Sequence, residues 1–122
     1  AISINYYLDL DPDNKLIDQW ASAAGKPFII SEIGAGAIMG YHDPFGQAKW
    51  SEERQADILD EQLRAILSMP RVSGAYIWQF ADVRVDEGWA MARPRTHNNK
   101  GVVNEYRQPK MAYKVVKDLF TE

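Results

Sequence analysis

Apolar and polar positions alternate in blocks along the chain, and the blocks predict strands and helices in turn. Short apolar runs predict strands at residues 2–7, 28–30 and 74–80. Apolar residues at helical spacing predict three helices: one ending before Gly25, one with Ser51 as its N-cap that ends at Pro70, and one starting at Pro109. Strands that alternate with helices indicate parallel pairing with right-handed crossovers, and therefore an α/β fold.

The polar and aromatic clusters all follow a strand and precede its helix. Two long loops, 37–49 and 81–104, carry many of these residues, and loops of that length are usually functional. In an α/β barrel or an open α/β sheet the loops after the strands gather on one face. The residues expected to converge there are Asn5, Tyr7, Glu32, Trp78, Asn98 and Lys100.

Glu32 is the strongest candidate for chemistry. It follows the buried run at residues 28–30, and Gly34 and Gly36 after it let the backbone turn and leave room for a ligand. A carboxylate in that position is typical of an α/β-barrel active site. A retaining glycosidase needs a second carboxylate about 5–5.5 Å away, and Asp82 does not share the setting of Glu32. The alternative is that Glu32 is a solvated residue at a strand end.

Two further sets of residues could contact a ligand. The ammonium and amides of residues 98–101 could hold an anionic substituent, or could be a solvated turn. Aromatic faces suit the C–H faces of sugar rings, although core packing explains about half of the aromatic side chains near strand ends. Those aromatic residues are Tyr6, Tyr7, Tyr41, Trp78, Phe80 and Trp89.

The composition of the chain excludes several classes of function. The chain has 122 residues, 46% of them hydrophobic, and a formal net charge of −3, which argues against a nucleic-acid surface. No apolar run is long enough for a membrane span, and the lack of cysteine excludes disulfides and fits a cytoplasmic protein. His42 and His97 lack metal-ligand spacing and no phosphate-binding glycine motif is present, so no metal or cofactor is expected.

Four segments resemble glycoside hydrolase family 2. Residues 26–35 with 40–42 resemble the strand that carries the family's nucleophile, and residues 77–82 resemble its last barrel strand. Residues 98–101 with 107–110 resemble the segment leading into the last helix, and residues 5–7 resemble the strand two units before the end. The resemblance covers nearly the whole chain in the right order. Ile33 departs from the pattern, because the family usually has an aromatic residue there.

The resemblance implies a role for each candidate. It implies that Glu32 is the nucleophile, that Asn5 and Tyr7 are its neighbours, and that Trp78 lines the sugar pocket. The Asn98-x-Lys100 pair is similar to that of β-glucuronidases, where it contacts the sugar carboxylate. The implied substrate is a terminal β-glucuronide, with a β-galactosidase-like relative as the alternative.

The resemblance also implies that much of the catalytic domain is missing. The family's barrel has eight strands, and residues 1–122 resemble a C-terminal fragment of about the last three βα units of a (β/α)8 TIM barrel. The family's acid/base glutamate lies on an earlier strand, so the piece alone is expected to be inactive. It is expected to associate with the rest of the barrel or with a copy of itself. A non-catalytic sugar-binding or assembly module is the alternative. The start at Ala1, directly before a strand, also indicates a piece cut from a longer protein.

Overall fold

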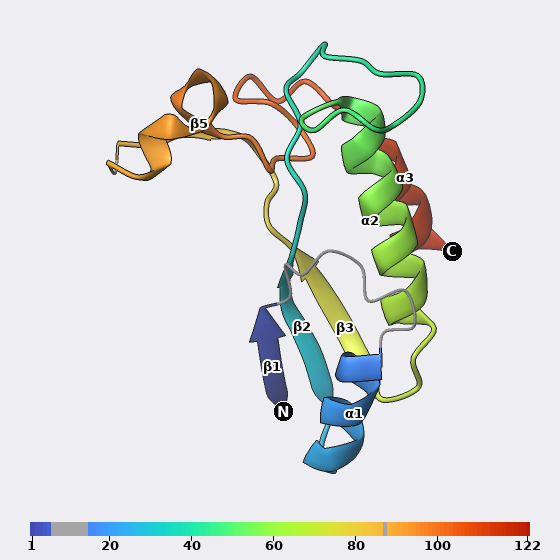
Figure 1. The fold of residues 1–122 in the computed structure, drawn as a ribbon. Helices are drawn as coiled ribbons and strands as arrows, with labels where there is room; N and C mark the ends of the chain where they lie inside the picture. Colours follow the sequence, from blue (N-terminus) through green and yellow to red (C-terminus); the bar gives the residue numbers. More distant parts are fainter. Residues whose placement is uncertain (6–14, 87) are drawn as a thin grey trace. The chain divides into compact units, whose positions relative to one another are not determined.

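The computed structural model describes residues 1–5, 15–86 and 88–122 and divides into two compact units (Figure 1). The first unit contains residues 1–33 and 61–77, and the second contains residues 34–60 and 78–122. Helix α2 (Glu52–Leu67) contributes its first nine residues to the second unit and the rest to the first. No helix over the described ranges combines the length and apolar content needed to cross a bilayer.

The first unit is built on a three-stranded parallel sheet. Its strands are β1 (Ile2–Asn5), β2 (Phe28–Ile33) and β3 (Val72–Ile77), in the order β1-β2-β3 (Figure 1). The central strand β2 buries Phe28, Ile30 and Ile33, because its apolar residues meet neighbours on both edges. The predicted parallel pairing and α/β class are confirmed.

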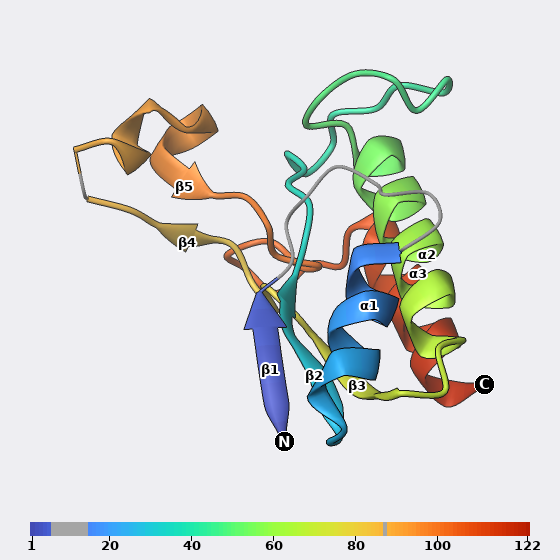
Figure 2. The same ribbon diagram turned by 60° about the horizontal axis from the view of Figure 1, so that its bottom comes forward.

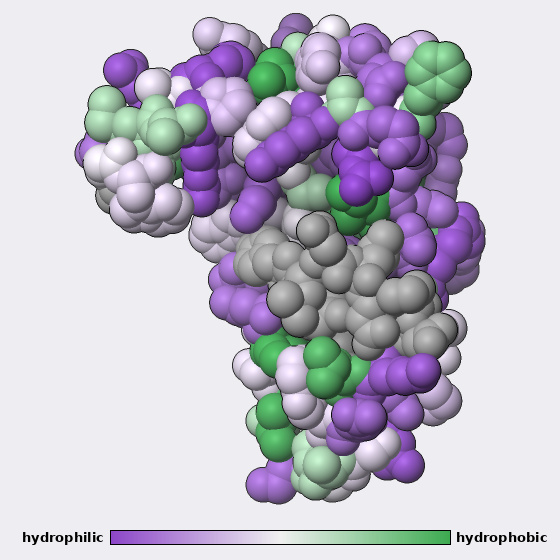
Figure 3. Space-filling model, viewed as in Figure 1, coloured by the Kyte–Doolittle hydropathy of each residue, from purple (hydrophilic) through white to green (hydrophobic). Residues whose placement is uncertain are grey.

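Helix α1 (Lys15–Ala24) lies beside β1 and β2 (Figure 2). Gly25 ends the helix with a φ of 59°, a left-handed conformation that glycine adopts without a steric cost. An apolar groove of about 430 Å³ lies between helix and sheet. Exposed apolar surface over β1 and α1 is visible in the lower part of Figure 3. The groove is lined by Ile2, Ile4, Trp20, Ala23, Ala24 and Phe28.

The strands end at different residues from those predicted. β2 extends through Glu32 to Ile33, whereas β3 covers residues 72–77 instead of 74–80. Residues 79 and 80 leave the strand because their backbone pairs elsewhere: the Gln79 N–H donates to the Lys100 carbonyl, and the Phe80 carbonyl accepts the Val103 N–H.

In the second unit the segment between β2 and α2 is fixed by carboxylates. The Ser51 hydroxyl caps α2 by accepting the Arg54 N–H at 3.2 Å, as the sequence predicts. The buried Glu52 carboxylate accepts the Gly40 N–H at 2.8 Å and the Met111 N–H at 2.9 Å. It therefore ties the loop to the first residue of the last helix.

The last helix, α3, covers Met111–Thr121, so the predicted start at Pro109 is wrong. Lys110 is the extended residue before the helix, with a φ of −84° and a ψ of 171°. Its N–H donates to the Val102 carbonyl, and Pro109 forms a bridge with Val103, so these two residues pair as an extended segment.

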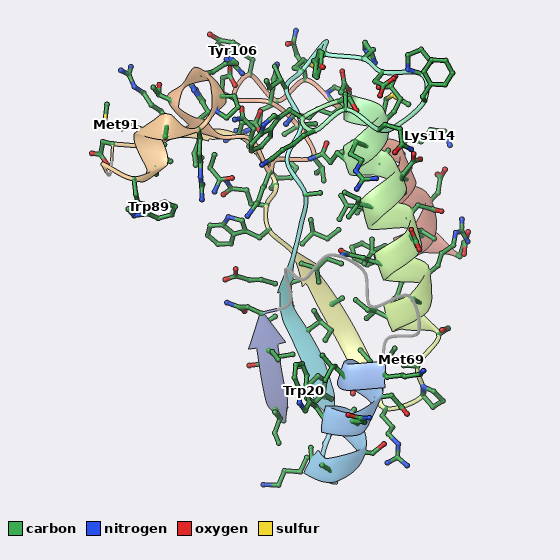
Figure 4. The ribbon with its side chains drawn as sticks, in the orientation of Figure 1. Trp20, Met69, Trp89, Met91, Tyr106 and Lys114 are labelled. Atoms are coloured by element: carbon green, nitrogen blue, oxygen red, sulfur yellow. The ribbon has the colours of Figure 1, made fainter. Side chains whose placement is uncertain are left out.

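The predicted loop at 81–104 contains regular structure. β4 (Val83–Arg84) pairs antiparallel with β5 (His97–Asn98), and two 3₁₀ turns, η1 (Ala90–Ala92) and η2 (Pro94–Thr96), lie between them. Trp89 and Met91 project from this segment (Figure 4) and are 72% and 52% exposed.

Asp43 organises the turn at residues 43–48. Its carboxylate accepts the N–H groups of Phe45, Gln47 and Ala48 at 3.1, 2.8 and 2.7 Å. These hydrogen bonds, that from Ala48 foremost, lower the pKa of Asp43 below its ordinary value of 3.8. The Asp43 N–H in turn donates to Glu53 and lowers the pKa of that carboxyl.

Replacing Glu52 with glutamine should loosen the start of α3. The amide keeps one neutral acceptor oxygen, so the Gly40 and Met111 N–H groups both lose a charged partner and one of them loses its acceptor, at a cost of about 1–3 kcal/mol. Faster amide hydrogen exchange at residues 111–114 of the full-length protein checks this. Glu61→Gln, an exposed site on the same helix, is the matched control and should leave that exchange unchanged.

The Asp43 turn should open in acid. A carboxyl with a lowered pKa stabilises the folded state above its unfolded pKa, and that contribution is lost as the pH falls through the lowered value. At pH 7 Asp43→Asn should speed amide exchange at residues 45–48, corrected for intrinsic rates, and the difference between the two proteins should shrink as the pH falls through the lowered pKa of Asp43. Asp86→Asn, at an exposed position, is the control. Equal exchange of wild type and Asp43→Asn at pH 7 would contradict the account.

Candidate functional site

In the first unit the structure brings Glu32 and Asn5 together. The register of β1 and β2 shifts after Ile4, so that Asn5 pairs with Glu32 and skips Ser31. The Ser31 hydroxyl donates to the Asn5 side-chain carbonyl at 2.7 Å. Glu32 is half-buried and Asn5 is exposed, so a carboxylate and an amide stand at the carboxyl end of adjacent parallel strands. Such irregularities commonly redirect side chains beside active sites.

The other predicted residues are placed as follows. Tyr7 lies outside the described residues. Trp78, Asn98 and Lys100 belong to the second unit, so their expected convergence with Glu32 stays a prediction. Trp78 directly follows β3, is 41% exposed, and joins Gln79 through a cis peptide bond.

Asn98 and Lys100 share one turn of the second unit. The Asn98 side-chain carbonyl accepts the Lys100 N–H at 3.1 Å, a local bond of the kind that asparagine makes in turns. Asn98 is 8% exposed and Lys100 is half-buried. The turn therefore places an amide and an ammonium two residues apart on a backbone that the side chain of Asn98 itself stabilises.

Gly101 follows this turn in a position that only glycine fits. A Cβ atom there would lie 2.3 Å from the Asp82 nitrogen and 2.3 Å from the Val103 carbonyl oxygen. Backbone atoms cannot move aside as a flexible side chain can. The close approach lets the Gly101 N–H donate to the Asp82 carboxylate at 2.9 Å.

The residue that the sequence did not reveal is Lys110. Its ammonium is fully buried and donates to Asp82 Oδ1 at 2.8 Å, the Ala37 carbonyl at 2.6 Å and the Asn99 carbonyl at 3.1 Å. Asp82, considered above as a second carboxylate, is thus the partner of a buried ion pair. A cation beside a helix N-terminus is unfavourable for the helix dipole, and that signal could have indicated a special role for Lys110.

Burial shifts the pKa values of both members of this pair. It raises the pKa of Asp82 and lowers the pKa of Lys110, because each charged form loses its hydration, while the ion pair opposes both shifts. Removing one partner of such a pair typically costs about 3–5 kcal/mol, whereas replacing both with apolar residues of similar volume is often neutral. Among the described residues no cluster of three His, Asp or Glu side chains is arranged to hold a metal ion.

The chain is similar to known glycosidases. It is 50% identical to a structure of a GH2 β-galacturonidase from Eisenbergiella tayi bound to galacturonate, with a TM-score of 0.87 over 98% of this chain. It is 33% identical over 87% of its length to a β-glucuronidase of Paenibacillus borealis. It is 40% identical over 78% of its length to one of Sus scrofa. No protein-family model matches the chain.

The matches cover only part of each relative. The chain spans 17% and 14% of the length of the two β-glucuronidases, and 23% of the β-galacturonidase chain. The aligned part includes nearly all of the residues described above. Over most of its length the chain therefore matches a part of these β-glucuronidases and of a β-galacturonidase of glycoside hydrolase family 2, as a fragment of a GH2 enzyme would.

Proposed function

We propose that the chain is part of a retaining glycoside hydrolase that cleaves terminal β-uronides, with Glu32 as the nucleophile. The observation that carries the proposal is the similarity to proteins named for uronides, over a stretch containing both Glu32 and the Asn98-x-Lys100 turn. A uronide differs from a neutral sugar by its carboxylate, which an ammonium and an amide bind well.

Glu32 would attack the anomeric carbon and form a covalent glycosyl-enzyme, which water then hydrolyses. Its place at the carboxyl end of β2, paired in register with Asn5, supports this role. A second carboxylate protonates the leaving group and then activates the water. The sequence offers no second strand-end carboxylate in the setting of Glu32, so that group would come from elsewhere in the full-length protein. General acid–base catalysis contributes about 10²–10⁴-fold, so the chain alone is expected to be inactive.

The substrate-binding residues are proposed to be Asn5, Tyr7, Trp78, Asn98 and Lys100. Asn5 stands beside Glu32, and the exposed Trp78 offers a ring face for the sugar. Asn98 and Lys100 would bind the uronate carboxylate from their shared turn.

The fold supports a place in a (β/α)8 barrel, with the rest of the barrel as the partner of this chain. Three parallel strands with helices between them are the repeating pattern of such barrels. β1 and β3 are the outer strands of the sheet, and the apolar groove beside β1 presents surface that further barrel elements could cover. A second copy of the chain could also cover this surface, but it would not supply the acid/base residue that the proposed reaction needs.

Glu32→Gln in the full-length protein should lower kcat by at least about 10³-fold, because the glutamine amide cannot attack the anomeric carbon. Turnover of p-nitrophenyl β-D-glucuronide and β-D-galacturonide checks this. Glu61→Gln is the matched control, an exposed glutamate within α2, and should keep wild-type turnover. Wild-type turnover by Glu32→Gln would reject Glu32 as the nucleophile.

A β-galacturonide is the second candidate substrate, because the relative named for it is 50% identical whereas the two β-glucuronidases are 33% and 40% identical. The two sugars differ only in the configuration of the C4 hydroxyl. We expect kcat/KM of the full-length protein to be higher for both uronides than for the neutral galactoside and glucoside. A preference for the neutral galactoside would favour the β-galactosidase-like alternative instead.

A further inference from the structure

Most backbone polar groups of residues 99–101 are hydrogen-bonded to other segments of the second unit or to the Asn98 side chain. The Asn99 carbonyl accepts the Ala37 N–H at 2.9 Å, and the Lys100 carbonyl accepts the Gln79 N–H at 3.0 Å. The Gly101 carbonyl accepts the Gln55 amide at 3.0 Å. All of these groups belong to the second unit, so the backbone that carries the Lys100 side chain is fixed within that unit.

The ion pair of Asp82 and Lys110 is hydrogen-bonded to this backbone on both sides of Lys100. Lys110 Nζ donates to the Asn99 carbonyl, one residue before Lys100. Asp82 Oδ1 accepts the Gly101 N–H, one residue after it. The same oxygen accepts a hydrogen bond from Lys110 Nζ. The ion pair between the two buried charges therefore connects the hydrogen bond to the Asn99 carbonyl with the one from the Gly101 N–H.

The pair is a poor source of stability, because burial disfavours both charged forms. Asp82 Oδ2 is also buried and has no hydrogen-bond partner among the described residues. An apolar pair of similar volume would fill the same space without these costs. What it could not do is bond to the Asn99 carbonyl and the Gly101 N–H.

We propose that Asp82 and Lys110 are positioning residues for uronate recognition. By fixing residues 99–101, they present Asn98 and Lys100 in the arrangement that binds the sugar carboxylate. This inference rests on the proposed function and extends it to two buried residues that do not touch the sugar. Their loss should therefore reduce the preference for uronides and leave neutral sugars unaffected.

The test uses the full-length protein with the double substitution Asp82→Leu and Lys110→Met, which removes both charges and keeps a branched and a straight side chain at the two positions. We measure kcat and KM for p-nitrophenyl β-D-galacturonide and β-D-glucuronide and for their neutral counterparts, the β-D-galactoside and β-D-glucoside. We expect kcat/KM for the uronides to fall about 10- to 100-fold, the effect of a small misplacement of binding groups. The values for neutral sugars should stay close to wild type.

Lys100→Ala supplies the reference. It should cause the same selective loss, and adding the double substitution to it should cause little further loss, because both changes act on one interaction. The exposed pair Lys114–Asp118 on α3 (Figure 4) is the matched control. Lys114→Met with Asp118→Leu should leave both substrate classes at wild-type values.

A folded double variant that loses activity equally on both substrate classes, or on neither, would overturn the inference. So would losses that add fully to those of Lys100→Ala. If the double variant does not fold, Asp82→Asn decides, because it keeps an oxygen for Gly101 and removes the charge. It should shift the preference in the same direction by a smaller factor, and an unchanged preference would overturn the inference. Failure of the proposed function looks different, since the wild type itself would then not prefer uronides.

Discussion

The buried ion pair between Asp82 and Lys110 is the constraint on which the second unit depends. Two charges without access to water require compensating hydrogen bonds, and this pair receives them from two further segments of the chain. The Ala37 carbonyl comes from the loop after β2, and the Asn99 carbonyl and the Gly101 N–H come from the segment after β5. Satisfying the two charges therefore sets the relative positions of segments that are distant in the sequence.

The first unit follows a simpler rule. Its central strand is apolar, so it is buried, and the polar residues come at its carboxyl end. The register shift after Ile4 then sets Glu32 opposite Asn5. The acid at a strand end in the first unit is the residue that we propose as the nucleophile, and the amide–ammonium turn in the second unit is the part that we propose to bind the uronate.

Much of this could be predicted from the sequence. The helices and parallel strands follow from periodicity, and the Ser51 cap from residue type. The start of α3 could not be predicted, because Lys110 is held extended by Val102, a tertiary contact. The end of β3 was misplaced for the same reason, since residues 79 and 80 pair with residues 100–103.

The candidate site likewise contains residues that the sequence indicates and residues that it does not. Glu32 and the Asn98-x-Lys100 turn have local signals, a buried run before a carboxylate and an asparagine two residues before a lysine. The pairing of Asp82 with Lys110 has no such signal, because the two are 28 residues apart; only the unfavourable place of Lys110 beside a helix N-terminus sets that residue apart. Only three-dimensional contacts reveal that both are fully buried.

The central claim is that the buried pair makes the turn bearing Asn98 and Lys100 rigid before any sugar binds. Hydrogen–deuterium exchange of the sugar-free, full-length protein measures this directly at the amides of residues 100–103. The account predicts that these amides exchange as slowly as those of β2. Exchange as fast as that of the amides of the exposed residues Gly88 and Trp89 would contradict it.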